Sequence, residues 1–313
     1  MRQRLTSSGR VSIWRLSERR REALDFYLGI MPWAVGFIVF GGGPIVASFV
    51  LSFMDWKVLA APRRVGLANY QHLIFGDKVF RTALGNTLYY TALSVPLGVL
   101  ASMLLAVLVN QKVPGQNLFR TIYYLPSVTS GVAVALLWVW LFNPNFGLIN
   151  YVLSLVGIRG PGWLSDVRWA KPALVLMSLW GAGGGMVIFL AGLQGMPEHL
   201  YDAAKIDGAG AWALFRHVTL PMLTPTIFFM LVTSVIGSLQ TFTNVYVMTN
   251  SGPGTATLMY GLYIYQNAFT FLKMGYACAL AWILFGVVLA LTWLQFQAGS
   301  RWVYYEAELR PAR

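Results

Sequence analysis

The sequence is divided into six long apolar segments that are separated by shorter polar ones. The apolar segments cover residues 27–53, 84–109, 122–142, 173–194, 227–248 and 276–296, and none of them contains Lys, Arg, Asp, Glu or His. A helix needs about 20 apolar residues to cross the roughly 30 Å hydrocarbon core of a bilayer. Because lipid cannot hydrogen-bond the backbone, such segments cross as helices. The pattern predicts an all-α integral membrane protein with six transmembrane helices.

Two further apolar stretches are expected to stay outside the bilayer. Residues 255–272 contain several Thr and Tyr residues together with Gln266 and Asn267, which makes this stretch too polar for lipid. A seventh span would also place the two ends of the chain on opposite sides of the membrane. Residues 148–156 are apolar but too short to cross, so we expect them to lie flat at the interface.

Composition agrees with a membrane protein. Of the 313 residues, 57% are hydrophobic and 11% are charged, whereas a soluble domain has about 25% charged residues. The net charge of +12 does not indicate nucleic-acid binding, because seven arginines lie within the first 21 residues, directly before the first apolar segment. With both termini inside, the inner segments hold 14 Lys and Arg and the outer loops hold 9. The positive-inside rule therefore favours an N-in, C-in topology.

This topology divides the chain into three parts. Residues 1–25 form a basic cytoplasmic tail, residues 26–300 form a six-span membrane domain, and residues 301–313 form a cytoplasmic C-terminal tail. Within the fourth span, four glycines cluster at positions 181 and 183–185. They predict either close packing between helices or a broken helix that lines a cavity.

Several motifs of energised or catalytic membrane proteins are missing from the sequence. The predicted spans have no ionisable residue of the kind that ion-driven transporters use as coupling sites. The sequence also lacks the nucleotide-binding pattern G-x-x-x-x-G-K-[ST] and the metal-binding pattern H-E-x-x-H. We therefore expect a protein that is not an enzyme, binds no metal or other cofactor, and takes any energy for transport from another polypeptide.

The inner loop at residues 196–225 combines charged and small residues between two apolar spans. Pro197 and Glu198 are typical of a helix start, and Gly208 is typical of a helix end. A second helix is expected over 212–220. The pattern predicts a helical hairpin with a low-relief face of Ala203, Ala204, Gly208 and Ala209, an Asp202–Lys205 pair, and anchors at Tyr201, Phe215 and Leu220. A loop that only joins two spans is the plainer alternative.

This loop resembles the coupling loop of binding-protein-dependent ABC transporter permeases, whose pattern is E-A-A-x-x-x-G followed by I-x-L-P. The corresponding residues here are Asp202-Ala203-Ala204, Gly208 and Val218-Thr219-Leu220-Pro221. Asp207-Gly208-Ala209 is similar to the carbohydrate-uptake subgroup of maltose and glycerol-phosphate permeases. Further matches in the same order are Tyr124-Leu125-Pro126 and Ser251-Gly252-Pro253, and the resemblance covers roughly residues 28–300. Asp at 202 and Val at 218 depart from the family pattern.

The resemblance implies a type I ABC importer permease in a prokaryotic inner or plasma membrane. It implies a second homologous permease, two ATP-binding cassette subunits that bind ATP and Mg, and an extracytoplasmic solute-binding protein. It also implies which residues couple to the ATPase subunits: Asp202, Ala203, Ala204, Asp207, Gly208, Ala209, Leu220 and Pro221. The expected solute is a sugar or oligosaccharide.

Polar and aromatic residues within the spans are candidates for the solute path. The strongest are Asn86, Tyr89, Tyr90, Gln240, Thr243 and Asn244, and Ser234 and Ser238 share the fifth span with three of them. Contacts between helices are the alternative role for such residues. A glycerol 3-phosphate or other polar-solute permease, a stand-alone secondary transporter and a membrane enzyme remain alternative functions. The scattered Asp55, Asp77 and Asp166 give little support to an enzyme.

Overall fold

The computed structural model describes residues 18–111 and 114–304. It is helical apart from one short β-hairpin. In chain order the elements are α1 (Glu18–Phe37), the π-helical turn η1 (Ile38–Gly42), α2 (Gly43–Ser52), β1 (Met54–Asp55), β2 (Arg63–Arg64), α3 (Ala68–Gln71), η2 (His72–Gly76), α4 (Lys78–Val109), α5 (Gln116–Val128), α6 (Gly131–Leu141), α7 (Leu148–Leu155), α8 (Val167–Leu179), α9 (Ala182–Gln194), α10 (Glu198–Ile206), α11 (Ala211–Leu214), η3 (Phe215–Thr219), α12 (Leu220–Met222), α13 (Thr224–Leu239), α14 (Thr243–Met248), α15 (Tyr260–Tyr265), η4 (Gln266–Thr270) and α16 (Met274–Gly299). The strands pair antiparallel, with Met54 opposite Arg64.

Three helical segments are each long and apolar enough to cross a membrane. They are Glu22–Ser52, Lys78–Val109 and Met274–Gly299. Three bent helix pairs meet the same criterion jointly, so the described residues contain up to six membrane-crossing segments. The short helices α15 and η4 lie within residues 255–272, and this stretch is not among the candidate spans. Of the predicted tails, residues 1–17 and 305–313 lie outside the described residues, while α1 begins at Glu18 and runs into the first span.

Three of the predicted spans are not continuous helices. The prediction of one helix for each apolar segment is therefore wrong for these three. The segment at 122–142 consists of α5 and α6, which meet at 99°, and the segment at 173–194 consists of α8 and α9, which meet at 43°. The α5 helix ends shortly after Pro126, because Thr129 and Ser130 adopt extended backbone angles. The third bent pair, Ala211–Met222 with Thr224–Leu239, meets at 60°, so the fifth candidate span begins before the predicted segment at 227–248. Within that segment, α13 ends at Leu239 and α14 begins at Thr243.

The long helix α4 is the centre of the bundle and packs against α8, α9, α13 and α15. The glycines of the fourth span allow the closest approaches. An ideal Cβ on Gly183 would lie 1.7 Å from the Tyr123 carbonyl oxygen of α5, and one on Gly185 would lie 2.5 Å from Ser102 Oγ of α4. Both alternatives for these glycines therefore apply, since the helix is tightly packed and also broken at Trp180 and Gly181.

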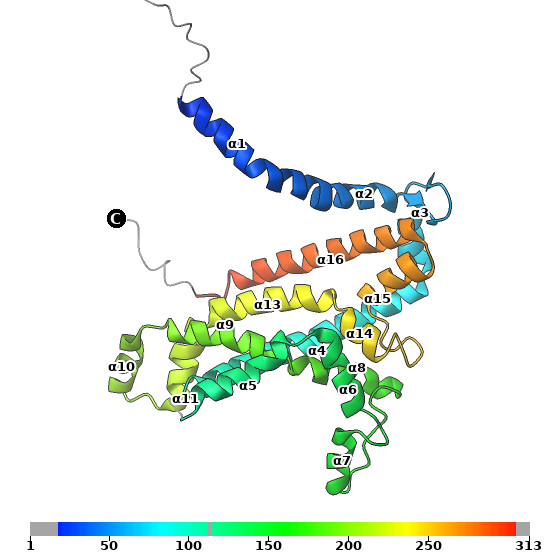
Figure 1. The fold of residues 1–313 in the computed structure, drawn as a ribbon. Helices are drawn as coiled ribbons and strands as arrows, with labels where there is room; N and C mark the ends of the chain where they lie inside the picture. The colour runs from blue at the N-terminus through cyan, green and yellow to red at the C-terminus, as the bar shows by residue number, and fades with distance from the viewer. Residues whose placement is uncertain (1–17, 112–113, 305–313) are drawn as a thin grey trace, which may run out of the picture.

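The two ends of the bundle carry different kinds of structure (Figure 1). The hairpin of α10 and α11 projects from one end, where α1 begins and α16 ends, and α3, α14 and α15 lie at the opposite end. The first helical segment leaves the bundle: α2 packs against α16, whereas α1 diverges from it (Figure 1). We call residues 196–225 the hairpin and use "outer cap" for residues 53–77, 143–166 and 249–273 at the opposite end.

Asp77 connects the outer cap to the starts of α4 and α16. Its Oδ1 accepts a hydrogen bond of 2.9 Å from the Phe80 backbone N–H, which caps α4. Its Oδ2 accepts from the hydroxyls of Tyr263, at 2.6 Å, and Tyr276. Burial alone would raise the pKa of Asp77, but the hydrogen bonds from both tyrosines and the backbone outweigh it and hold this pKa below its usual value. Burial, together with Asp77, raises the pKa of Tyr263 to about 12.

Candidate functional site

The end of α10 is a well-formed helix cap that depends on Gly208. The Gly208 N–H donates to the Lys205 carbonyl at 3.0 Å, and the Ala209 N–H donates to the Ala204 carbonyl at 2.9 Å. These two bonds are the Schellman arrangement, in which the residue after the helix takes a left-handed conformation. Gly208 has a φ of +82°, which glycine adopts without strain. The predicted helix end is therefore confirmed, and the cap fixes the direction of the chain toward α11.

Two of the three predicted anchors, Phe215 and Leu220, attach the base of the hairpin to the bundle, whereas Tyr201 joins two parts of the hairpin to each other. The Tyr201 hydroxyl lies 3.0 Å from Thr219 Oγ1 and so joins α10 to η3. Phe215 and Leu220 pack against a buried cluster that includes Phe189 of α9. The chain then reaches α13 through Pro221. The hairpin is thus a projecting unit whose base packs against α9 and continues into α13.

The tip of the hairpin is exposed. Asp202 and Lys205 form the predicted pair, with 3.3 Å between Oδ1 and Nζ, and both side chains are exposed. Ala203, Asp207 and Gly208 are also exposed, and Ala204 and Ala209 are half-buried. The coupling residues expected at 202–209 therefore share one accessible surface, while Leu220 and Pro221 lie at its base.

Sequence reasoning missed two large apolar side chains on the same tip. Ile206 is 86% exposed and Trp212 is 72% exposed. Trp212 stacks on Phe215 at a ring separation of 5.8 Å. Exposed side chains of this size at the centre of a polar hairpin are typical of a docking surface. Their position in a charged loop between two apolar segments was the available signal.

A polar groove adjoins the tip. It has a volume of about 490 Å³ and lies between α10 and the ends of α4 and α9. Its polar lining consists of Asn110, Gln194, Glu198, Tyr201, Asp202 and Lys205. The groove includes both acids of α10, so a partner with basic groups would complement this face.

A second candidate site is a cavity of about 280 Å³ within the bundle. It is bounded by α4, by the break between α8 and α9, and by α13. Its polar lining consists of Tyr90, Ser94, Ser102, Ser178, Ser234, Ser238 and Thr241. The Ser94 hydroxyl is buried and has no hydrogen-bond partner among the described residues. Hydroxyl groups around an aromatic ring, with apolar surface between them, suit a polar uncharged group such as a sugar ring.

Of the six residues predicted for the solute path, Tyr90 lines this cavity. Asn86 lies on the same helix, but its Nδ2 donates to the carbonyls of Thr255 and Leu258 at 2.9 and 3.1 Å. Tyr89 faces Lys171. The other three, Gln240, Thr243 and Asn244, lie at the break between α13 and α14, next to the cavity residue Thr241. The serines at 94, 102 and 178 were not predicted, because single serines in apolar spans carry no distinctive pattern.

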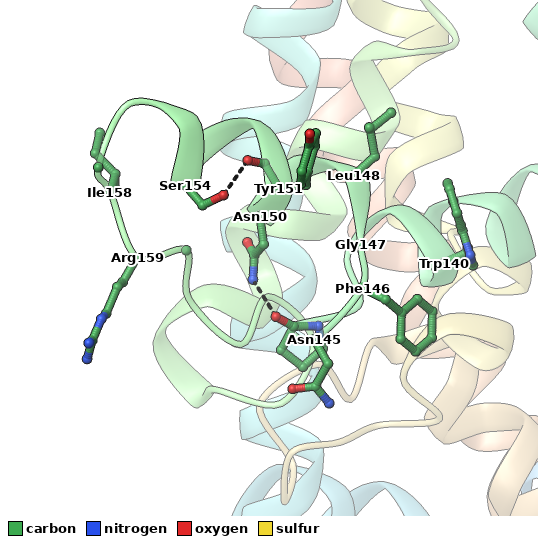
Figure 2. Close-up of a pocket in the computed structure, with 13 residues that line it drawn as sticks. Trp140, Asn145, Phe146, Gly147, Leu148, Asn150, Tyr151, Ser154, Ile158 and Arg159 are labelled. Carbon is green, nitrogen blue, oxygen red and sulfur yellow. Dashed lines mark hydrogen bonds between the residues drawn. The ribbon is translucent and has the colours of Figure 1, made fainter.

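The largest of the cavities described here, about 600 Å³, lies in the outer cap between α6 and α7. Figure 2 shows Trp140 and Phe146 on one side and Arg159 on the other. The Asn150 side chain, which lines this cavity, joins three parts of the loop around it. Its Nδ2 donates to the carbonyls of Pro144 and Pro161, each at 3.2 Å, and its Oδ1 accepts from Trp163 Nε1. Helix α7 lies beside this cavity. It covers most of the short apolar stretch at 148–156 that the sequence predicts to stay outside the hydrocarbon core.

Within residues 18–111 and 114–304, no group of three or more His, Cys, Asp and Glu side chains lies close enough together to hold a metal ion.

Comparison with known proteins gives a consistent result. The chain is 38% identical to the probable ABC transporter permease protein YesP of Bacillus subtilis (strain 168), over 97% of this chain and 99% of that protein. It is 36% identical to the lactose transport system permease protein LacF of Rhizobium radiobacter, over 91% of this chain and 97% of that protein.

Solved structures agree. The chain is similar to a chain of the bacterial alginate ABC transporter, crystallised in complex with an alginate pentasaccharide-bound periplasmic protein. The TM-score is 0.80 at 26% identity, covering 92% of this chain and 98% of that chain. The model of the family described as the binding-protein-dependent transport system inner membrane component matches residues 94–301. This chain, an ABC importer permease in fold and not an enzyme, belongs to that family of membrane transport components.

Proposed function

We propose that this chain is the transmembrane permease subunit of an ATP-driven importer that moves a sugar or oligosaccharide delivered by an extracytoplasmic solute-binding protein. The observation that carries the proposal is the hairpin, where Ile206 and Trp212 are exposed beside the Asp202–Lys205 pair. Exposed apolar side chains on a charged, capped projection need a protein partner. We assign that partner as an ATP-binding cassette subunit.

The complete transporter would contain two such ATPase subunits, which bind ATP and Mg, and a second homologous permease. The chain would lie in a prokaryotic inner membrane with both termini and the hairpin in the cytoplasm. Asp202, Ala203, Ala204, Asp207, Gly208 and Ala209 would contact the ATPase. Leu220 and Pro221 would pass its movement to α13. Because α13 lines the cavity, a shift of the hairpin when ATP binds would change the access of the cavity to either side.

The solute class rests on the cavity and on the relatives. Seven hydroxyl-bearing residues line the cavity, and the path candidates Gln240, Thr243 and Asn244 lie beside it. The relatives named for solutes are a lactose permease and an importer of alginate, which is an acidic polysaccharide. Saccharides are therefore the favoured class of solute. The two relatives differ in the charge of theirs, since lactose is neutral and alginate is acidic.

The test is Gly208→Glu in the complex assembled with its permease, ATPase and binding-protein partners. We expect the variant to insert and assemble, and to lose solute-stimulated ATPase activity, because a charged side chain would protrude into the docking surface. Gly208→Ala is the matched control, since it imposes the same strain at a φ of +82° and adds one methyl group to open space. Normal stimulation in Gly208→Glu, or solute accumulation by this chain alone in liposomes, would contradict the proposal.

A further inference from the structure

We propose that Lys171 makes the solute path of this importer selective for a saccharide that carries an anionic group, a carboxylate or a phosphate. This inference rests on the proposed function and specifies its solute. Sequence reasoning assigned Lys171 to an outer loop. In the structure it lies within the first turns of α8, which together with α9 is long and apolar enough to cross a membrane.

The ammonium group of Lys171 points inward, to α4. Its Nζ donates to Asn86 Oδ1 at 3.1 Å and lies 4.9 Å from the centre of the Tyr89 ring. A lysine near the end of a membrane helix usually extends its charge outward to the lipid headgroups. Contacts with two residues of a neighbouring helix show that this lysine does not.

Lys171 has no acidic partner in the part of the chain that the structure describes. The ion pairs there are Arg168 with Asp166 and Lys205 with Asp202. Asn86 is a neutral acceptor, and its own donors are taken by the carbonyls of Thr255 and Leu258. An ammonium group has three donors, and one is used here. A half-buried cation without a counter-ion has lost part of its hydration, and an anionic ligand would restore that stabilisation.

The position of Lys171 relates it to the hydroxyl-lined cavity. Ser178 lines the cavity and follows Lys171 by seven residues on α8, so the two lie on one face of the helix, about 10 Å apart at 1.5 Å per residue. On α4, the cavity residue Tyr90 follows Asn86 by four residues and also shares its face. The Lys171–Asn86 pair therefore lies between the cavity and the outer cap. A saccharide entering from that end would pass the ammonium group.

The charge of the outer cap and its adjoining helix starts favours the same solute. The segments predicted to lie outside hold 9 Lys and Arg against three acids, Asp55, Asp77 and Asp166. Asp77 is buried and bonded to two tyrosines, and Asp166 caps α8 and pairs with Arg168. The third acid, Asp55, is exposed, and it remains to offset the positive charge of the Lys and Arg residues in these segments. A positive surface at an entrance attracts anions and repels cations.

The experiment uses the complete transporter reconstituted in phosphatidylcholine proteoliposomes, with ATP on the side of the ATPase subunits and the binding protein on the other side. The probes are a neutral galacto-oligosaccharide, the matching galacturonate oligosaccharide and a hexose phosphate. We expect the wild type to transport the carboxylate or the phosphate probe. Lys171→Gln keeps an N–H donor for Asn86 and removes the charge, and it should lower transport of the anionic probe about tenfold to a hundredfold. Lys171→Arg should retain most of it.

Arg168→Met is the matched control, because this cation is exposed, lies one turn away and pairs with Asp166. It should leave transport of the anionic probe unchanged. The proposal is overturned if the wild type transports only the neutral probe, if Lys171→Gln transports the anionic probe like the wild type, or if Lys171→Gln loses basal ATPase activity or assembly. Transport of only the neutral probe, driven by ATP, would leave the proposed function intact. Absence of ATP-driven transport of every probe would overturn both.

Discussion

The hairpin and the outer cap are both made of short helices and turns, yet their side chains are arranged in opposite ways. In the outer cap, polar side chains connect segments that are far apart in sequence: Asn86 joins α4 to residues 255–258, and Asp77 joins the start of α4 to α15 and α16. In the hairpin, the hydrogen bonds of the α10 cap and the contact between Tyr201 and Thr219 all stay within residues 196–225.

This difference bears on the proposed coupling of the hairpin to an ATPase subunit. A region held by long-range hydrogen bonds resists deformation, whereas a projection joined at its base by Phe215 and Leu220 can receive a partner and move as a unit. We expect the outer cap to depend on internal contacts for its stability and the hairpin to depend on a partner for its role. The following predictions compare the two regions, beginning with the largest expected effect.

The largest effect should come from Gly275→Ala at the start of α16. An ideal Cβ at this position would lie 2.0 Å from the Met54 carbonyl oxygen and 3.1 Å from the Trp56 backbone nitrogen. Because backbone atoms cannot move aside cheaply, we expect a loss of about 3 kcal/mol in stability. The measurement is the apparent Tm of the purified protein in detergent. Gly210→Ala in the hairpin is the control, since its Cβ meets open space. Equal Tm values for the two variants would remove the contrast between the regions.

The next effect should come from Trp212→Ala. Removing a large exposed side chain from the hairpin should leave Tm unchanged and weaken binding of the ATPase subunits by about 2 kcal/mol, or roughly thirtyfold in Kd. The binding can be measured by titrating detergent-solubilised permease with the ATPase subunits. Phe146→Ala is a matched change at the outer cap, where the ring is 63% exposed. If Phe146→Ala weakened ATPase binding as much as Trp212→Ala did, the assignment of the hairpin as the docking surface would be wrong.

The smallest effect should come from Asp77→Asn, and it should depend on pH. The pKa of Asp77 is lowered in the folded protein, so its stabilising effect is complete above the unfolded pKa of about 3.9 and is lost as the pH falls through the folded pKa. We expect the variant to be less stable by about 1 kcal/mol near neutral pH, with the gap in Tm closing below about pH 4. A gap that stays constant down to pH 3 would contradict the role of the Asp77 carboxylate. The hairpin variant Trp212→Ala should show no such pH dependence.

Much of the hairpin could be predicted from sequence because its determinants are local. Glu198 is in the first turn of α10, Gly208 ends the helix, and Asp202 and Lys205 pair within one turn. The anchors at Phe215 and Leu220 also followed from their spacing. The exposure of Ile206 and Trp212 could not be predicted in this way, because it depends on how far the hairpin projects from the bundle.

The sequence by itself determined that the protein is a helical membrane protein, because apolar segments of this length have no other stable environment than a bilayer. It also determined the local cap and pairing of the hairpin. The tertiary structure decided where α5 and α6 bend, which serines surround the cavity, and that Lys171 contacts Asn86 and Tyr89. These features depend on contacts between residues that are far apart in the chain, such as Asn86 and Leu258, and such contacts leave no periodic or local pattern in the sequence.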